Sequence, residues 1–448
     1  MVRVTDMTHG RPIRLILLFS LPLMLGSVFQ QLYTIVDTII IGRGVGMQAL
    51  ASIGAADWIN WLVLWGLQGF TQGFAILAAQ EFGAGAYDRL RRVLAMIVKL
   101  SCWFGIAVTI ISLLLVRPLL TLLHTDPAVF GGAQTYLYVQ FGGSLIIIAY
   151  NMAAAVLRCL GDSRTPLFAI IAASFANIAL DLLFVMGFGW GIFGASFATV
   201  LAQLIAFLLC LRSLRPFVQL TKADWKTDPA ILLHLCRLGI PTGLQMSMIT
   251  LGGMVLQSVL NGFGVVFVAG YTAANKLYGI LESASVAFGY AMTAYMGQNR
   301  GARNAARIDA GIRAVLVLSA EFTAAIVTAM LVAGKPLLGL FLSTEEAGAA
   351  DALAVAYQYL MVLMAFLFAL FMLQAYRSSL QGLGEMTVPT LSGFAEMLMR
   401  MGAALVLPTF IGQSGVFFAE GAAWVCAAAL NLVWYYMRIG KIKRDMLK

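Results

Sequence analysis

The feature that most constrains this chain is a series of long apolar runs that continues along its whole length. The run at residues 21–42, LPLMLGSVFQQLYTIVDTIIIG, is long enough to cross a bilayer, and comparable runs follow it. A spanning helix needs about 20 mostly apolar residues. Backbone groups in hydrocarbon must be hydrogen-bonded internally, which leaves helix bundles or closed barrels. Because the runs are continuous rather than alternating, we predict an all-α polytopic membrane protein.

The composition supports this class and argues against several others. Of 448 residues, 61% are hydrophobic and 11% are charged, whereas soluble domains have roughly 25% charged residues. The first apolar run, 13–41, is longer than the core of a cleavable signal peptide, so we expect an uncleaved anchor. The five cysteines are scattered without a CxxC pair and the three histidines lie far apart. We therefore expect neither a disulfide framework nor a zinc site.

We predict twelve spanning helices, six in each half of the chain. The expected spans are 13–41, 49–80, 93–116, 130–156, 165–187, 191–211, 231–261, 268–297, 309–333, 352–381, 388–410 and 415–437. Basic residues gather before the first span, in every second loop and after the last span. The other loops hold Arg43, Arg117 and Lys335. Positive loops stay in the cytoplasm, so we predict a protein of the inner (plasma) membrane of a prokaryote, with both termini cytoplasmic.

The two halves of the chain resemble each other. Pro22 in the first matches Pro241 in the second, and AAAVLRCLGDSRTP resembles YRSSLQGLGEMTVP, with Gly161 matched by Gly384. We read a six-helix repeat. Six is even, so the two repeats are parallel in the membrane. The predicted domains are an N-terminal lobe at 1–211, a polar cytoplasmic linker at 212–230 and a C-terminal lobe at 231–448.

The first half carries two acidic residues at membrane depth. A charge there costs about 2.5–3.5 kcal/mol even on insertion scales, so it is usually functional. Asp37 shares its helix with Pro22, which removes one backbone hydrogen bond and provides a place to bend. Asp37 aligns with Leu256 or Gln257 of the second half, and Asp181 with Ala404. This asymmetry favours a function housed in the first half. The alternative for Asp37 is a buried partner of a lysine or of a helix end.

Neutral oxygen ligands accompany these acids. Asn177 lies four residues before Asp181, hence on the same helix face, and the next helix offers Thr199. Together with Asp37 these residues supply carboxylate, amide and hydroxyl oxygens, which suit a proton or a hard cation such as Na⁺. Alternatively, Asn177 and Thr199 only make interhelical hydrogen bonds.

The second half has its own membrane charges. Glu396 and Arg400 are four residues apart, so we predict a local ion pair. Arg377 and Glu282 are candidates to line a substrate path, and we add Gln245 and the aromatic Tyr33 to it. Aromatic faces attract cations, which makes such a wall suitable for flat hydrophobic cations.

The order of these motifs resembles the multidrug and toxic compound extrusion (MATE) family over essentially the whole chain. The residues that carry the resemblance are Pro22 and Asp37, the loop Gln80-x-x-Gly83-Ala84-Gly85, the loop Leu160-Gly161-Asp162-x-x-x-Pro166, and Asn177-x-x-x-Asp181. The two first-lobe aspartates look like the DNA-damage-inducible branch. For that branch the resemblance implies that Asp37, Asn177, Asp181 and Thr199 form the cation site. It also implies that bending at Pro22 couples ion binding to substrate release.

The function that the resemblance implies is antiport. We expect export of organic, cationic amphipathic compounds against H⁺ or Na⁺ by a monomer, with no cofactor beyond the coupling ion and no nucleic-acid partner. A lipid-linked oligosaccharide flippase of the same superfamily is the alternative, and a major-facilitator transporter is a more distant one. The sequence has no GxxxxGK[ST], HExxH or GxSxG motif, so we do not expect an enzyme.

Overall fold

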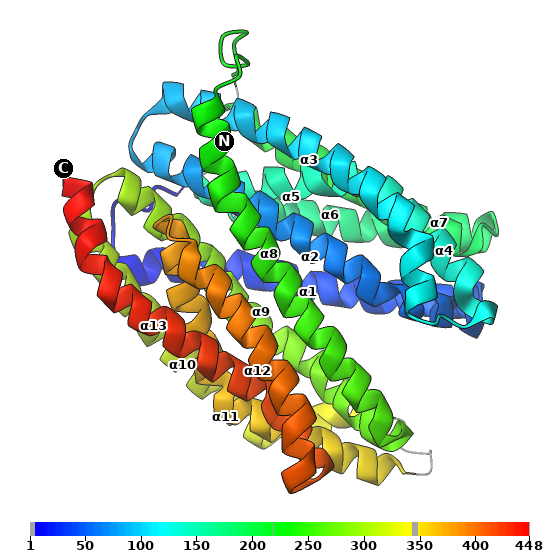
Figure 1. Cartoon of the computed structure of the whole chain (residues 1–448). Coiled ribbons are helices and arrows are strands. Elements are labelled where there is room, and N and C mark those ends of the chain that lie inside the picture. The colour runs from blue at the N-terminus through cyan, green and yellow to red at the C-terminus, as the bar shows by residue number, and fades with distance from the viewer. Residues whose placement is uncertain (1–4, 218, 343–347, 448) are drawn as a thin grey trace. The chain divides into compact units, whose positions relative to one another are not determined.

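The fold is built from α-helices in the part of the chain that the computed structural model describes, residues 5–217, 219–342 and 348–447. The first half holds α1 (Pro12–Gly44), α2 (Met47–Gly83), α3 (Tyr87–Leu122), α4 (Pro127–Gly142), α5 (Ser144–Cys159), α6 (Arg164–Asp181), the π-helix η1 (Leu182–Gly187) and α7 (Gly191–Leu214). The second half holds α8 (Pro229–Leu260), the short η2 (Asn261–Phe263), α9 (Val265–Gly301), α10 (Ala305–Gly339), α11 (Ala349–Gly382), α12 (Thr387–Ile411), η3 (Gln413–Phe417) and α13 (Phe418–Leu447). Figure 1 shows these elements. The predicted all-α membrane class is confirmed.

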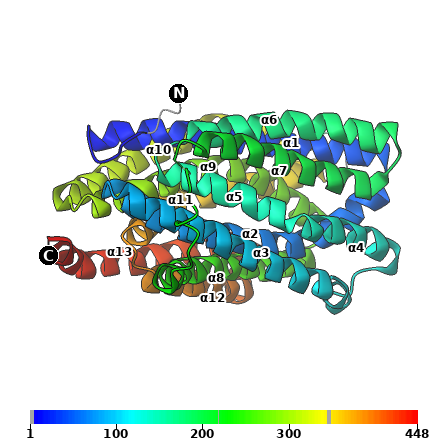
Figure 2. The same ribbon diagram turned by 90° about the horizontal axis from the view of Figure 1, so that it is seen from above.

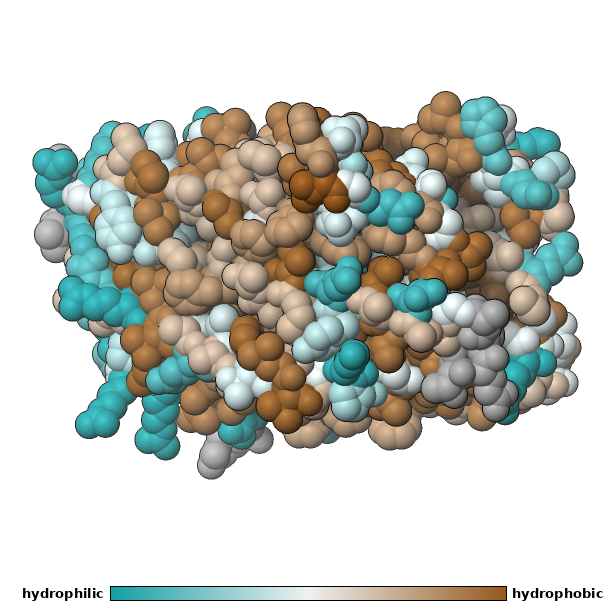
Figure 3. Space-filling model, turned by 90° about the horizontal axis from the view of Figure 1, so that it is seen from below, coloured by the Kyte–Doolittle hydropathy of each residue, from teal (hydrophilic) through white to brown (hydrophobic). Residues whose placement is uncertain are grey.

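Most helices of the described residues are long and apolar enough to span a membrane. Ten helices are long and apolar enough to cross a membrane, and the pair α4 and α5 makes an eleventh span. Helix α9 has 37 residues, enough to span, but it lacks a window of comparable hydropathy. Large apolar side chains on the helices remain exposed, such as Leu114 at 72% and Phe410 at 77%. On the face in Figure 3, hydrophobic residues cover most of the middle, as expected for contact with lipid.

The predicted span 130–156 is wrong in one respect, because it is broken. Helices α4 and α5 meet at Gly143 with a bend of 50°. A Cβ on Gly143 would lie 2.5 Å from Val200 Cγ2 of α7. Glycine thus permits this close approach to α7, and the Gly143–Ser144 pair is of the type at which helices kink.

The packing of the first half recurs in the second. In the first half α2 packs on α3, α4 and α5, α5 on α7, and α6 on α7. In the second half α9 packs on α10 and α11, α11 on α13, and α12 on α13. Figures 1 and 2 both show α6 beside α7. The matched glycines Gly161 and Gly384 both have positive φ, +96° and +72°, a backbone conformation that glycine adopts without steric cost.

The helices form two compact units whose borders differ from the predicted lobes. One unit holds Leu21–Gly243, and the other holds Met7–Ser20 and the chain from Leu244 onward. The start of α1 therefore belongs to the second unit, where the hydroxyl of Ser20 donates to the carbonyl of Ala287 at 3.4 Å. Both borders lie inside helices, beside the matched prolines Pro22 and Pro241.

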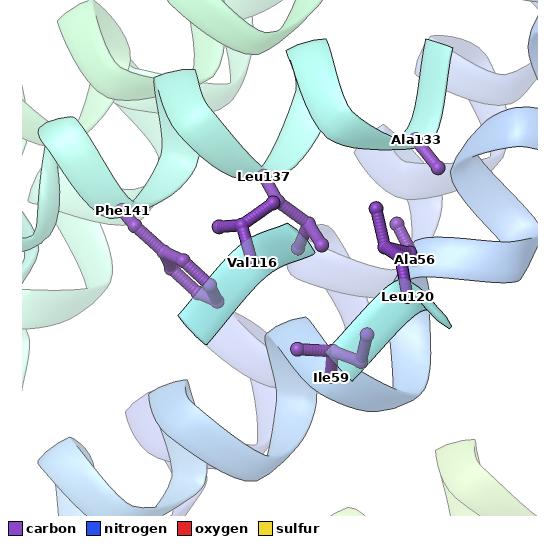
Figure 4. Packing of buried hydrophobic residues seen from close by; sticks show 7 residues of the cluster. All are labelled: Ala56, Ile59, Val116, Leu120, Ala133, Leu137 and Phe141. Carbon is purple, nitrogen blue, oxygen red and sulfur yellow. The ribbon is translucent and has the colours of Figure 1, made fainter. Parts of the chain in front are cut away.

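The core of the first unit is made where α2, α3 and α4 meet. Seven buried apolar residues interlock there, as Figure 4 shows: Ala56, Ile59, Val116, Leu120, Ala133, Leu137 and Phe141. Burial of each large side chain stabilises the fold by about 1.5–3 kcal/mol. This cluster fixes α2 and α4 in the unit that also carries Asp37.

The linker is shorter than predicted, since α7 ends at Leu214 and α8 begins at Pro229. Lys99 of α3 holds it, donating to the carbonyl of Trp225 at 2.5 Å and to the hydroxyl of Thr227 at 2.9 Å. The backbone N–H and hydroxyl of Thr221 donate to Asp224 at 2.8 Å each and keep the pKa of that carboxyl below its usual value.

Candidate functional site

Two aspartates from different helices meet in the first unit. Asp37 lies on α1 and is half-buried, whereas Asp181 is the last residue of α6 and is fully buried. Their carboxyl groups are close enough to interact directly. Within the described residues, both oxygens of Asp181 and Oδ1 of Asp37 are buried without a donor. Two acceptors placed together in this way need a proton or a cation between them.

Asn177 extends this group by one turn of α6. It is 1% exposed, and neither atom of its amide has a hydrogen-bond partner among the described residues. Burying an amide without hydrogen-bond partners costs about 1–3 kcal/mol of folding free energy. Such a group is unusual in a helix whose role is only structural. Asn177 and Asp181 are both buried, which is consistent with their four-residue spacing, and the amide is available to a ligand.

The helix changes its winding directly after Asp181. Residues 182–187 form the π-helix η1, while the matching segment of the second half, around Ala404, stays within α12. Single π-turns occur frequently at functional sites. The π-turn was not predicted, because no residue pattern in 182–187 separates it from an α-helix.

A cavity opens beside these residues, between α1, α5, α6 and α7. The space between its lining atoms is about 390 Å³, including the part that is open to the surroundings. Its polar and aromatic lining is Gln30, Tyr33, Tyr150, Ser174, Asn177, Thr199 and Gln203, and alanines and Ile170 complete it. No lysine or arginine contributes to this lining among the described residues. The cavity offers amide, hydroxyl and aromatic groups to a guest, and its lining residue Asn177 lies one helical turn before Asp181.

Thr199 and Tyr33 are placed differently within this site. Thr199 lines the cavity, and its hydroxyl donates to the carbonyl of Ala195 in its own helix at 3.2 Å. It therefore presents an acceptor oxygen rather than a donor. Tyr33 lies one turn before Asp37 and interacts electrostatically with Asp37 and Asp181. One face of α1 therefore contributes both to the lining of the cavity and to the pair of carboxylates.

Several lining residues were missed from the sequence. Gln30 precedes Tyr33 by three residues, Ser174 precedes Asn177 by three, and Gln203 follows Thr199 by four. These spacings place Gln30, Ser174 and Gln203 on the same helix faces as Tyr33, Asn177 and Thr199. Their place in the site could therefore have been predicted from the sequence. Asp57 of α2 also interacts electrostatically with Asp37. Nearby, Asn60 donates to the hydroxyl of Tyr136 at 3.2 Å.

The other predicted path residues belong to the second unit. Gln245 is fully buried and accepts a hydrogen bond from Gln381 at 2.8 Å. Glu282 on α9 interacts electrostatically with Glu420. Neither lines the cavity of the first unit. Pro22 lies inside the continuous helix α1.

Arg377 is engaged in a buried ionic cluster. It pairs with Glu396 at 2.5 Å, and Glu396 pairs with Arg400 at 3.1 Å. Arg400 also pairs with Glu420 at 2.8 Å and donates to the carbonyl of Ile249. The predicted Glu396–Arg400 pair is confirmed. The side chains of Arg377, Glu396 and Arg400 are at most 6% exposed, so we interpret this cluster as structural.

The described residues hold no group of three or more His, Cys, Asp or Glu side chains able to bind a metal ion. A cation at the aspartate pair would therefore take its further ligands from neutral oxygens, such as that of Asn177.

Comparison with known proteins identifies the family. A family profile described as MatE matches residues 22–183 and again 241–406. This chain belongs to the MATE family. Each match begins at or beside one of the two matched prolines, Pro22 and Pro241, and together the matches cover most of the chain.

MATE relatives and structures match along the whole chain. The probable multidrug resistance protein YpnP of Bacillus subtilis (strain 168) is 32% identical over 455 residues, covering 99% of this chain and 98% of that protein. The crystal structure of MATE in complex with MaL6 has a TM-score of 0.91 at 24% identity, covering 99% of this chain and 100% of that one.

A second solved structure has a similar fold. It is a MOP superfamily transporter from Pyrococcus furiosus Vc1 (DSM3638), with a TM-score of 0.90 at 24% identity, covering 98% and 99% of the two chains. Reverse polarity of its binding pocket is said to suggest a different function. Identities this low establish the fold, and the function must be argued from the site.

Proposed function

We propose that this MATE protein exports organic compounds in exchange for H⁺ or Na⁺, with the ion bound at Asp37 and Asp181. The observation that carries the proposal is the pairing of two carboxyl groups whose buried oxygens lack donors, directly beside a polar and aromatic cavity. Asn177 and Thr199 contribute neutral oxygens. The presence of two first-unit aspartates favours the DNA-damage-inducible branch.

Coupling follows from the geometry of α1. The ionised carboxylates of Asp37 and Asp181 would repel each other, and a proton or Na⁺ bound between them removes this repulsion. The bound ion therefore favours the arrangement in which α1 lies against α6. Because Tyr33 and Gln30 lie on the same helix as Asp37, a shift of α1 also reshapes the cavity. An ion that binds one arrangement of α1 more tightly shifts the population toward that arrangement. The substrate is released because the cavity then has a different shape.

The absence of cationic side chains from the described lining favours this proposal over a lipid-linked oligosaccharide flippase. A pyrophosphate group requires basic side chains in its cavity, and none lines the cavity of the first unit. In the second unit Arg377 and Arg400 are occupied by glutamates. Organic cations, by contrast, are attracted by aromatic faces such as those of Tyr33 and Tyr150.

The whole protein then works by alternating access. We propose that it resides in the prokaryotic inner membrane with both termini in the cytoplasm, as the distribution of Lys and Arg indicates. It functions as a monomer, and its two units move against each other to expose the cavity to each side in turn. Transport requires no covalent step and no cofactor besides the ion.

The test is export of a fluorescent organic cation from reconstituted vesicles under separately imposed Na⁺ and H⁺ gradients. We expect one gradient to drive export, and Asp37→Asn or Asp181→Asn to reduce the driven rate at least about tenfold, equivalent to ~1.4 kcal/mol. The control is Asp88→Asn, an exposed acid of the same unit whose partner is Arg91. Gradient-driven export at the wild-type rate in both site variants would refute the proposal.

A further inference from the structure

An apolar groove runs along the second unit where α12 and α13 lie side by side (Figure 1). The space between its walls is about 920 Å³, including the part that is open to the surroundings. Leu391 of α12 forms one wall, and Leu430, Val433 and Trp434 of α13 form the other. Leu391 is 56% exposed and Val433 54%. These exposed apolar walls fit a hydrocarbon chain rather than a polar ligand.

The sequence of α13 explains why this surface is hollow. Cys426 and Ala429 are small, whereas Leu430, Val433 and Trp434 are large, and all five lie on one helix face. Small and large side chains thus occur together along the wall that α13 contributes. A lipid-facing helix with uniformly large side chains would leave no such groove.

A basic side chain lies one helical turn beyond the groove residue Trp434. The guanidinium carbon of Arg438 lies 5.0 Å from the centre of the Trp434 ring, one turn further along α13. Arg438 Nε and the indole nitrogen of Trp434 are buried and have no hydrogen-bond partner among the described residues. Arg438 also lacks an acidic partner there, whereas Lys443 of the same helix pairs with Asp309.

The sequence around Arg438 adds positive charge. Five of the last eleven residues are basic: Arg438, Lys441, Lys443, Arg444 and Lys448. Tryptophan gathers at the boundary between hydrocarbon and headgroups, and one helical turn is about 5.4 Å. If Trp434 lies at that boundary, Arg438 lies at the depth of the lipid phosphates.

We propose that this groove binds one anionic phospholipid. Its acyl chain fills the groove over Cys426 and Ala429, and its phosphate accepts hydrogen bonds from the guanidinium of Arg438. The planar fork of arginine matches a phosphate group, and stacking on Trp434 holds it in place. Basic pockets between spanning helices on the cytoplasmic side are suited to anionic headgroups, and the net charge distinguishes this lipid from the zwitterionic lipids around it.

Trp434 provides the reporter for the test. The full-length protein is reconstituted with increasing fractions of phosphatidylglycerol or phosphatidylcholine whose acyl chains carry bromine, which quenches tryptophan fluorescence on contact. The Trp434 signal is the difference between wild type and Trp434→Phe. We expect half-quenching at an about fivefold lower fraction of the anionic lipid, the ratio that corresponds to ~1 kcal/mol per basic residue near an anionic surface.

The variants assign the preference to Arg438. Arg438→Gln should remove the fivefold ratio, and Arg444→Gln should keep it. Arg444 is a matched control because it is an exposed residue of the same helix, and its Nε donates to the carbonyl of Gly440 at 3.3 Å. An excess of inorganic phosphate should leave the ratio unchanged, because the acyl chain anchors the lipid.

Four outcomes would overturn the proposal. Equal quenching by the two lipids in wild type would mean an ordinary surrounding lipid, and this comparison needs no charge variant. Retention of the ratio in Arg438→Gln, or equal loss in Arg444→Gln, would place the preference elsewhere. Loss of the ratio in inorganic phosphate would mean a site for the free ion.

Discussion

Arg400 is a charged side chain that is buried in this protein because acidic partners compensate its charge. It is 5% exposed and has two glutamate partners, Glu396 and Glu420, besides the carbonyl of Ile249. All three guanidinium nitrogens of Arg400 therefore face an acceptor. Burying an ion pair gives little net stability, but removing one partner leaves an uncompensated charge.

Arg400→Met should therefore lower the free energy of unfolding by about 3–5 kcal/mol. The measurement is denaturant or thermal unfolding of the purified protein in detergent. Arg444→Gln, an exposed arginine on α13, serves as the control and should change stability by less than about 0.5 kcal/mol. Equal stability of Arg400→Met and wild type would mean that the cluster is not buried as described.

The site residues differ from Arg400 in lacking partners. Asn177 and Asp181 are as deeply buried as Arg400, yet none of their side-chain polar atoms is paired among the described residues. A folded protein retains such groups at a cost. Arg400 is paired with two glutamates in the second unit, whereas the buried polar groups of Asn177 and Asp181 in the first have no partner, which favours an ion site at these two residues.

Helix α9 shows that packing against neighbouring helices lets a helix of this bundle carry polar residues. It is the predicted span whose hydropathy falls short, and it packs extensively on α11. Gly270 lets the two backbones approach, since a Cβ there would lie 2.4 Å from the carbonyl oxygen of Ala352. A helix covered by its neighbours does not have to be apolar on every face, so α9 can carry Glu282 and Asn299.

Two glycine substitutions should therefore change stability in opposite directions. Gly270→Ala should destabilise by about 1–3 kcal/mol because the added methyl group meets backbone atoms of α11. Gly402→Ala on α12 should be neutral or stabilise by up to about 1 kcal/mol, since a Cβ there meets nothing within 4 Å and alanine favours helix. Unfolding of both variants in detergent provides the comparison. A stabilising Gly270→Ala would contradict the close contact.

At the scale of the whole molecule, the chain passes between the two compact units inside helices. One border lies between Ser20 and Leu21, directly before Pro22, and the other between Gly243 and Leu244, shortly after Pro241. A proline inside a helix lacks one backbone hydrogen bond and lowers the cost of bending. If alternating access operates as proposed, we expect α1 and α8 to bend near these prolines.

Pro22→Ala should accordingly slow export by several-fold while changing substrate affinity less than about twofold, because it stiffens α1 without touching the cavity. Turnover and dye binding are measured on the same vesicle preparation. Pro118→Ala is the matched control, since Pro118 lies inside α3, which stays within one unit. Unchanged turnover in Pro22→Ala would remove the hinge from the mechanism.

Much of this protein follows from the sequence alone. Long apolar runs require spanning helices, because lipid cannot satisfy backbone groups. The repeat predicts that both halves pack alike, and the spacing of Asn177 and Asp181 places them on one helix face. The spacing of Glu396 and Arg400 likewise predicts their ion pair. These inferences rest on local periodicity, which a linear sequence records.

Other features were decided by the tertiary structure. The break at Gly143 depends on the close approach of Val200, and the partner of Arg377 is a glutamate nineteen residues away on another helix. The cavity exists because α1, α5, α6 and α7 leave space between them, and the start of α1 packs with the second unit rather than with its own half. Such contacts depend on how helix surfaces fit in three dimensions, which no spacing along the chain encodes.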